Sequence, residues 1–322
     1  MRPPRALTAL CLFAAIGAAA CGSSSAKSGS GPVTSGDSQN PDANQLQAIV
    51  ASFDLAVGPP ARFIVQVQMG DGRLVGYGTI RMSVHQQNQN APSQVAQFLP
   101  IPGTKPPSPI PPQPQLVHAV QGRGVYGATV HLTSPGLWVA DVQADVKDVG
   151  TMRASTTFQV NPTHTAVTIG EKAPASNNLT LANHGHLPLS AVDSRAQGKA
   201  PVPDPQLHQH TIAAALATHQ PIVIVVSTPV YCVSRFCGPT TDLVESTAKR
   251  DAGKAVFIHL EIWANYNNQQ LNEAAAQWIA RGPGDANEPW VFVVGRDGIV
   301  KARFDNVVTP AELDDAIARY AS

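Results

Sequence analysis

The chain has 322 residues, with 22 Lys and Arg against 22 Asp and Glu, and 43% of its residues are hydrophobic. This neutral balance, without a basic run, gives no electrostatic footprint for nucleic acid, so we expect no nucleic-acid partner. The length predicts two domains, and the aliphatic content excludes a wholly disordered chain.

Residues 1–20 have the features of a secretory signal peptide. Two arginines precede an apolar run, residues 6–20, which is too short to span a bilayer and ends in small residues. Cys21 follows directly, and this arrangement resembles the lipobox of bacterial lipoproteins, although Ala18 stands where leucine is usual. The resemblance implies lipidation of Cys21, and therefore an exported protein held by acyl chains at the outer face of the cytoplasmic membrane. The alternative is an ordinary export signal in which Cys21 is incidental.

A polar tether and a β-rich domain follow. Residues 21–48 are rich in Ser, Gly, Asn, Asp and Gln, which predicts a disordered tether. Residues 49–165 alternate apolar and polar side chains with period 2, which predicts antiparallel strands that each bury one face. The pattern G-x-Y-x-A-x-V-x-L at residues 124–132, then a turn and G-x-W, resembles the immunoglobulin-like modules of exported bacterial proteins. It implies an all-β immunoglobulin-like sandwich.

Residues 166–206 carry few signals of regular structure, and we expect a linker there. Two His-x-His pairs, at residues 184–186 and 208–210, lie in or just after it. Because no third ligand stands beside either pair in the sequence, we predict no metal site and no other cofactor.

Residues 207–322 form the second predicted domain, in which buried strands alternate with helices. The turn signal Asp297-Gly298 predicts a hairpin between the last two strands. The expected helices are residues 212–217, 240–250, 269–280 and 311–320, and the expected strands are residues 221–226, 255–262, 290–294 and 299–304. Beginning at the first strand, the order is βαβα and then ββα.

This order resembles the thioredoxin-like superfamily. Cys237-Gly238-Pro239 leads into a helix, and Glu288-Pro289 leads into the third strand. The resemblance implies an α/β thioredoxin-like fold with an active site formed by Cys232, Cys237 and Pro289, the proline being in a cis peptide bond against the thiols. Thr240 takes the place of the second cysteine of a thioredoxin.

The spacing of the two cysteines restricts where they lie. Residues five apart on a helix have Cα atoms about 8.6 Å apart, whereas a disulfide needs less than about 7 Å. Cys232 must therefore lie in the loop, with Cys237 at or just before the helix start, where the helix dipole favours a thiolate. We take Cys237 as the nucleophile and Cys232 as the resolving cysteine, and the reverse order stays open.

Cys11 leaves with the signal peptide and Cys21 carries the lipid, so Cys232 and Cys237 are the one remaining thiol pair of an exported chain. Such a pair in an oxidising compartment predicts a thiol–disulfide oxidoreductase acting on exported proteins that carry thiols or disulfides. Apolar side chains near the pair favour a polypeptide partner. These side chains are Val230, Tyr231, Val233, Phe236 and Trp290.

Three alternatives remain. The first is a binding or assembly factor in which the disulfide is only structural. The second is a copper chaperone like the Sco proteins, whose C-x-x-x-C-P motif is similar, but residues 282–289 hold no histidine to serve as the third copper ligand. The third is a peroxiredoxin, and here Pro229 stands where that family has threonine.

Overall fold

The structure is a computed structural model that describes residues 42–320, apart from residues 87, 88, 90, 119, 120, 199, 233 and 282–285. The predicted signal peptide, the lipidation of Cys21 and most of the predicted tether lie outside the described residues. Among the helices of the described part, none is both long and apolar enough to cross a membrane.

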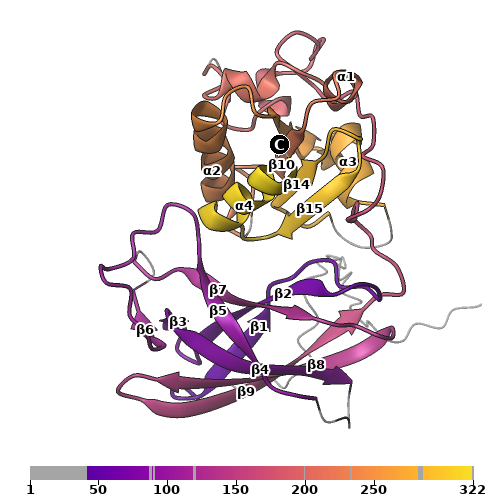
Figure 1. Ribbon diagram of the computed structural model, residues 1–322. Helices are drawn as coiled ribbons and strands as arrows, with labels where there is room; N and C mark the ends of the chain where they lie inside the picture. Colours follow the sequence, from indigo (N-terminus) through magenta and orange to yellow (C-terminus); the bar gives the residue numbers. More distant parts are fainter. Residues whose placement is uncertain are drawn as a thin grey trace, which may run out of the picture. The chain divides into compact units, whose positions relative to one another are not determined.

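The N-terminal part of the described chain is an antiparallel β domain (Figure 1). Its strands follow one hydrogen-bonded path in the order β6-β3-β2-β7-β5-β4-β8-β9, and β1 pairs with β2. The strands are β1 Leu46–Val50, β2 Ala61–Met69, β3 Leu74–Gly76, β4 Thr79–Gln86, β5 Gln94–Pro100, β6 Gln115–Val117, β7 Gly124–Val130, β8 Gly136–Val146 and β9 Gly150–Val160.

Alternation along the strands builds the core of this domain. Trp138, Ala140, Val142 and Ala144 of β8 are buried while the residues between them are not, as period 2 requires. The all-β, antiparallel character predicted for this region is therefore confirmed. The strands, however, make one continuous nine-stranded sheet, because β5 pairs with both β4 and β7 and joins the two halves.

The segment 166–206, for which we expected a linker, contributes to the core of the C-terminal region. Ala166 and Val167 pack in a hydrophobic cluster with the side chains of β10, and Asp193 and Asp204 are fully buried. Its regular structure in the described residues is limited to short 3-10 turns, η1 Leu189–Ala191 and the start of η2 Pro205–His208.

The C-terminal region contains a four-stranded mixed sheet in the order β11-β10-β14-β15. The β10–β11 pair is parallel, and the other two pairs are antiparallel. The elements are α1 Ile212–Ala217, β10 Ile222–Ser227, α2 Cys237–Arg250, β11 Val256–Glu261, β12 Trp263–Asn265, β13 Gln270–Leu271, α3 Glu273–Ile279, β14 Trp290–Val294, β15 Val300–Asp305 and α4 Pro310–Tyr320.

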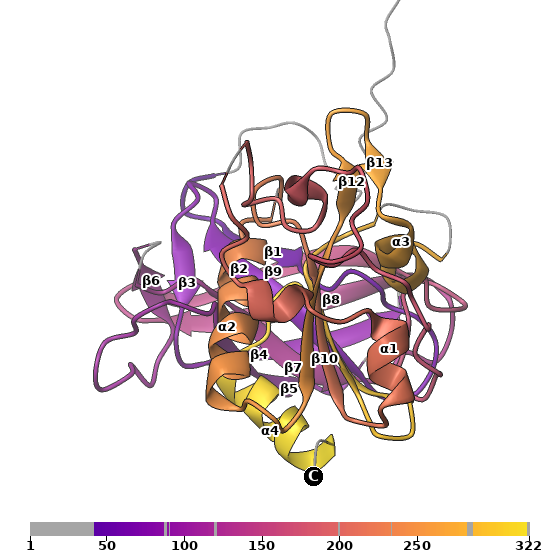
Figure 2. The same ribbon diagram turned by 90° about the horizontal axis from the view of Figure 1, so that it is seen from above.

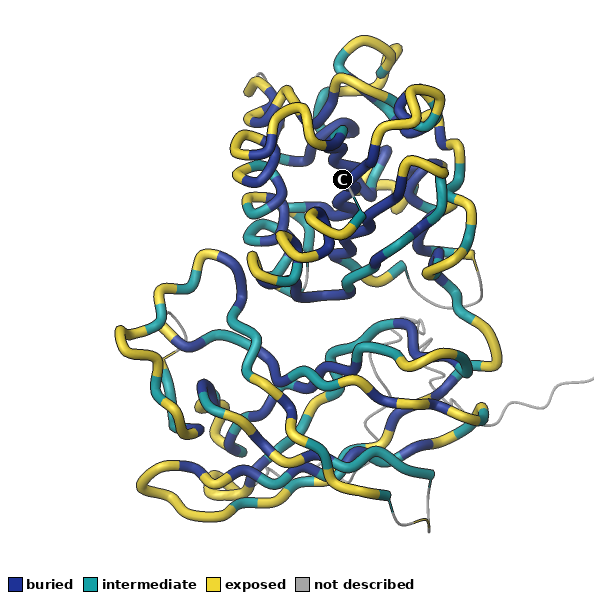
Figure 3. The backbone as a smooth tube through the Cα atoms, viewed as in Figure 1, coloured by how far each residue is buried: buried dark blue, intermediate teal, exposed yellow. Residues whose placement is uncertain are grey.

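Helices cover both faces of this small sheet. Ile222, Ile224 and Val226 of β10 pack on the side of α1 and α3, whereas Val223 and Val225 pack on the side of α2 and α4. Figure 2 shows α1 and α3 on one side of β10 and α2 on the other. All residues of β10 and β14 are buried, and these strands run dark blue through the middle of the region in Figure 3.

The predicted fold class is wrong. The described residues are mostly β, with about 37% of them in strands and 17% in helices, and the largest element is the antiparallel sheet. The C-terminal region has the expected order of helices and strands, but its sheet is small and mixed and does not establish an α/β thioredoxin-like fold. The error has a physical origin: short motifs such as Cys-Gly-Pro fix local turns and helix starts, whereas pairing between strands distant in sequence decides the fold.

Candidate functional site

The two cysteines form a disulfide at the junction between a loop and a helix. The Sγ atoms of Cys232 and Cys237 are 2.13 Å apart, and the Cα atoms are 6.1 Å apart. Cys232 lies in the loop after β10, and Cys237 is the first residue of α2. The structure therefore confirms the disulfide, and it confirms the placement of Cys232 in the loop and Cys237 at the helix start that the cysteine spacing predicted.

Cys237 lies in the first turn of α2, where backbone N–H groups have no acceptor earlier in the helix. Pro239 fits the first turn of α2 because the N–H that proline lacks has no partner there in a helix. The N-cap residue Phe236 gives no side-chain cap, and the first turn holds no acidic residue. A thiolate on Cys237 would therefore meet the positive end of the helix dipole, which stabilises it.

Burial distinguishes the two sulfurs. The Cys237 side chain is fully buried, whereas Cys232 is partly exposed. An incoming nucleophile therefore reaches Cys232 first. This favours Cys232 as the attacked residue and Cys237 as the resolving cysteine, the second of the two orders left open by the sequence.

Glu288 is a site residue that sequence reasoning missed. A carboxylate oxygen of Glu288 lies within 4.8 Å of both cysteine sulfurs, and Oε2 accepts a hydrogen bond of 2.6 Å from the Thr228 backbone N–H. Desolvation, with the nearby Glu261 carboxylate as a second cause, raises the pKa of Glu288 to about 8. The carboxyl is therefore mostly protonated at neutral pH. Its position just before Pro289 was the signal that could have revealed it.

Pro289 is buried just before β14, and the Glu288–Pro289 peptide bond is cis. Ser234 connects this bend to the cysteine loop. Its hydroxyl donates a 3.3 Å hydrogen bond to the Glu288 carbonyl oxygen and lies 3.2 Å from the Cys232 sulfur. The structure therefore brings Cys232, Cys237 and the Glu288–Pro289 bend into one site.

An aromatic surface flanks the disulfide loop, and we define it as Tyr231, Trp263 and Tyr266. The Tyr231 and Tyr266 rings stack with centroids 3.9 Å apart, and Trp263 meets Tyr266 edge-on at 5.5 Å. Tyr266 is 37% exposed, and the neighbouring Val230 is 46% exposed.

Trp290 and Val233 were also predicted to lie on the apolar surface near the thiols, and for neither does the structure bear this out. Trp290 is only 2% exposed and packs against Phe292 inside the sheet, so it cannot contact a partner. Val233 lies outside the described residues.

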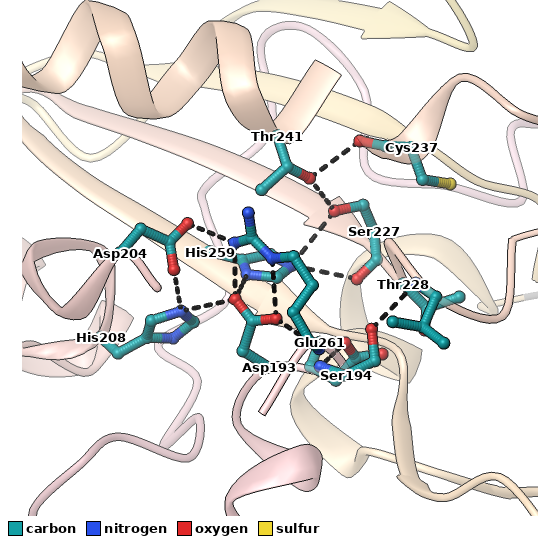
Figure 4. Close-up of polar contacts among 12 residues, drawn as sticks. Asp193, Ser194, Asp204, His208, Ser227, Thr228, Cys237, Thr241, His259 and Glu261 are labelled. Carbon is teal, nitrogen blue, oxygen red and sulfur yellow. Dashed lines mark hydrogen bonds and ion pairs between the residues drawn. The ribbon is translucent and has the colours of Figure 1, made fainter. Parts of the chain in front are cut away.

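A buried polar network lies behind the disulfide (Figure 4). The Thr241 hydroxyl donates to the Cys237 carbonyl oxygen at 2.9 Å and shares a 2.7 Å hydrogen bond with the Ser227 hydroxyl. His259 Nε2 lies 3.1 Å from both the hydroxyl and the carbonyl oxygen of Ser227. A chain of polar contacts therefore runs from the first turn of α2 to β11.

Two groups of described side chains have the spacing of metal ligands. One contains Cys232, Cys237 and Glu288, and the other contains two aspartates and two histidines, one of them on β11. The first group suits Cu(I) poorly, because this soft ion prefers sulfur and imidazole and the third member is a carboxylate.

Comparisons with known proteins assign no family. No family model matches the chain, and no curated protein matches it. One similar solved structure is the PKD domain of the human VPS10 domain-containing receptor SorCS2, at 17% sequence identity and a TM-score of 0.20, covering 45% of this chain and 98% of that chain. A likeness at this TM-score supports no conclusion about fold or function.

Proposed function

We propose that this protein is an exported, membrane-anchored thiol–disulfide oxidoreductase that acts on proteins of the cell envelope. One observation carries the proposal: a disulfide with one reachable sulfur, Cys232, and one buried sulfur at a helix start, Cys237, lies beside the largely protonated carboxyl of Glu288. Export and anchoring rest on the N-terminal sequence pattern.

In the oxidising direction, a partner thiolate attacks the Cys232 sulfur. A mixed disulfide forms between the partner and Cys232, the Cys232–Cys237 bond breaks, and its electron pair leaves on the Cys237 sulfur. The helix start stabilises this thiolate, and the Glu288 carboxyl supplies the proton that converts it to a thiol.

A second partner thiolate then attacks the partner's own sulfur in the mixed disulfide. The partner leaves as a disulfide, and Cys232 leaves as a thiolate. The partner dithiol is thereby oxidised by two electrons, and the cysteine pair is reduced. The reverse sequence reduces a partner disulfide and uses the same groups.

The aromatic surface supports a polypeptide partner. Tyr266 stacks on Tyr231, next to Cys232 in sequence, and both Tyr266 and Val230 are exposed. Rigid aromatic side chains beside a reactive pair can hold a polypeptide through apolar contact while its cysteine reacts.

Covalent trapping in cells tests the proposal. In Cys237→Ser, Cys232 keeps its thiol but lacks the resolving partner, so mixed disulfides with envelope proteins should accumulate. The matched variant Cys232→Ser keeps only the buried thiol and should trap little. Equal trapping by both variants would contradict the assigned roles, and the absence of trapping in both would favour the assembly factor with a structural disulfide.

A further inference from the structure

Four buried side chains converge on the face of the C-terminal sheet that α2 covers. They are Asp193, Asp204, His208 and His259, and each is 0% or 1% exposed. They come from three parts of the chain: the loop after η1, the short helix η2 with the residue before it, and strand β11. Their ligand atoms all lie within 4.8 Å of one another.

Three of the six distances between these four ligand atoms match the edges of a metal tetrahedron. Asp193 Oδ2 lies 3.4 Å from His208 Nε2 and 3.3 Å from His259 Nδ1, and Asp204 Oδ1 lies 3.3 Å from His208 Nε2. These separations are long for hydrogen bonds to a charged acceptor. Bonds of about 2.0–2.1 Å from zinc to nitrogen and oxygen place ligand atoms roughly 3.3–3.4 Å apart in a tetrahedron.

His259 supplies an independent observation. Its Nε2 lies 3.1 Å from the Ser227 carbonyl oxygen, which accepts the proton of that nitrogen. Its Nδ1 is buried, has no hydrogen-bond partner among the described residues and faces the Asp193 carboxylate. Metal-bound histidines typically donate their second ring N–H to a carbonyl in this way, which leaves the other nitrogen free to bind the metal.

Charge also favours a cation. Asp193 and Asp204 carry two negative charges, and Nη2 of Arg195 donates to Oδ2 of Asp193 at 2.6 Å and to Oδ2 of Asp204 at 2.5 Å. One guanidinium offsets one of these charges, and the remaining charge requires a second cation, which is either a bound metal ion or a protonated His259. The Nε of Arg195 donates to Asp193 Oδ1 at 3.0 Å while its Nη2 donates to Oδ2, the oxygen that also faces the two histidines, so the guanidinium fixes the orientation of the carboxylate, as an outer hydrogen-bond partner of a metal ligand does.

We propose that Asp193, Asp204, His208 and His259 form a structural site for one divalent metal ion of the zinc class. Nitrogen and oxygen donors in a closed tetrahedron suit Zn²⁺, and four protein ligands leave no open position for catalysis. The ion ties the segment 189–208 to β11. Through His259, Ser227 and Thr241 it also braces the carbonyl of Cys237 (Figure 4).

Metal analysis of the full-length chain, with its disulfide intact, tests this proposal. After loading with Zn²⁺ and dialysis, we expect one zinc per chain, and Co²⁺ in its place should give the intense visible absorption bands of a tetrahedral site. His208→Gln should weaken zinc binding by more than about 100-fold, beyond the loss caused by removing an outer hydrogen-bond partner. His210→Gln is the matched control, because His210 is exposed and outside the cluster, and it should bind like the wild type.

Two results would overturn the site. Wild-type protein that retains no zinc and gives no tetrahedral Co²⁺ spectrum would show that these four side chains do not hold a metal ion. Unchanged zinc affinity in His208→Gln would place any bound zinc elsewhere. The wild-type spectrum decides the question even if the variant fails to fold.

Discussion

A carboxylate oxygen of Glu288 lies within 4.8 Å of the Cys237 sulfur, although the two residues are far apart in sequence. Exchange at the disulfide releases a thiolate that needs a proton, and Glu288 is the acidic group that the structure places beside it. The proposed chemistry therefore depends on the ionisation state of one carboxyl group.

Glu288→Gln should slow disulfide exchange at neutral pH, and its rate should approach that of the wild type at alkaline pH. Glutamine keeps an acceptor for the Thr228 N–H but cannot transfer a proton. We therefore expect the exchange rate to fall about 100-fold, at the low end of the contribution of general acid catalysis. The wild-type advantage should shrink as pH rises through about 8, where Glu288 ionises. Rates of disulfide reduction by dithiothreitol from pH 6 to pH 9.5 give the ratio of the wild-type rate to the variant rate at each pH. The control is Glu273→Gln, at an exposed residue. A ratio independent of pH would remove Glu288 from the mechanism.

The same substitution should stabilise the fold at alkaline pH. The pKa of Glu288 in the folded chain is about 8, above the ordinary glutamate value of 4.5. Between these values the unfolded chain releases the proton while the folded chain keeps it, so this group's contribution to stability is lost as pH rises. Glu288→Gln removes that loss, and its free energy of unfolding should exceed that of the wild type by more than about 1 kcal/mol at pH 8 and much less at pH 4. Urea denaturation at both values checks this, and an advantage that is equal at both would contradict it.

Thr241→Val should destabilise the region behind the disulfide. The buried hydroxyl of Thr241 bonds to Ser227 and to the Cys237 carbonyl, and its removal leaves both without this partner, at a cost of about 1–3 kcal/mol. Thr247 is the matched control. It is buried on the same helix, and its hydroxyl has no hydrogen-bond partner within the described part of the chain. Thermal denaturation should show a lowered Tm for Thr241→Val only, and equal losses would mean that the network contributes nothing specific.

Tyr266→Ala should weaken the binding of a polypeptide substrate and leave the reaction with a small thiol unchanged. The exposed Tyr266 ring is half of the stack with Tyr231, so truncation removes apolar contact area for a docked chain. We expect KM for a cysteine-containing peptide to rise about tenfold, equivalent to about 1.4 kcal/mol, with no change for dithiothreitol. Ile169→Ala, at an exposed apolar residue outside the aromatic surface, is the control. A loss shared by both substrates would point to a disturbed disulfide loop instead of a docking surface.

Local features of this chain could be predicted from the sequence. Helix α1 and strand β14 lie at the predicted residues, because capping at Thr211 and the apolar run after Pro289 are local signals. The cysteine spacing alone placed Cys232 in the loop and Cys237 at the helix start. Each of these inferences depends on a few consecutive residues.

Features that depend on contacts between distant residues could not be predicted. Alternation shows that a strand has a buried face but not that β5 joins two halves of one sheet, and the error in fold class has the same origin. The pair His208 and His210 lacked a third ligand in the sequence, yet the fold brings Asp193 and His259 to His208, while His210 stays exposed. Glu288 reached the disulfide through the same kind of long-range packing.

The reduction potential of the Cys232–Cys237 pair tests the central claim most directly. Equilibration of the wild-type chain with glutathione buffers, followed by mass spectrometry of the alkylated forms, gives the fraction reduced at each potential. The proposed exchange predicts reversible titration at a potential above about −300 mV, the range of labile disulfides. A bond that stays oxidised in every buffer, with a potential below that value, would mark a structural disulfide and contradict the proposed function.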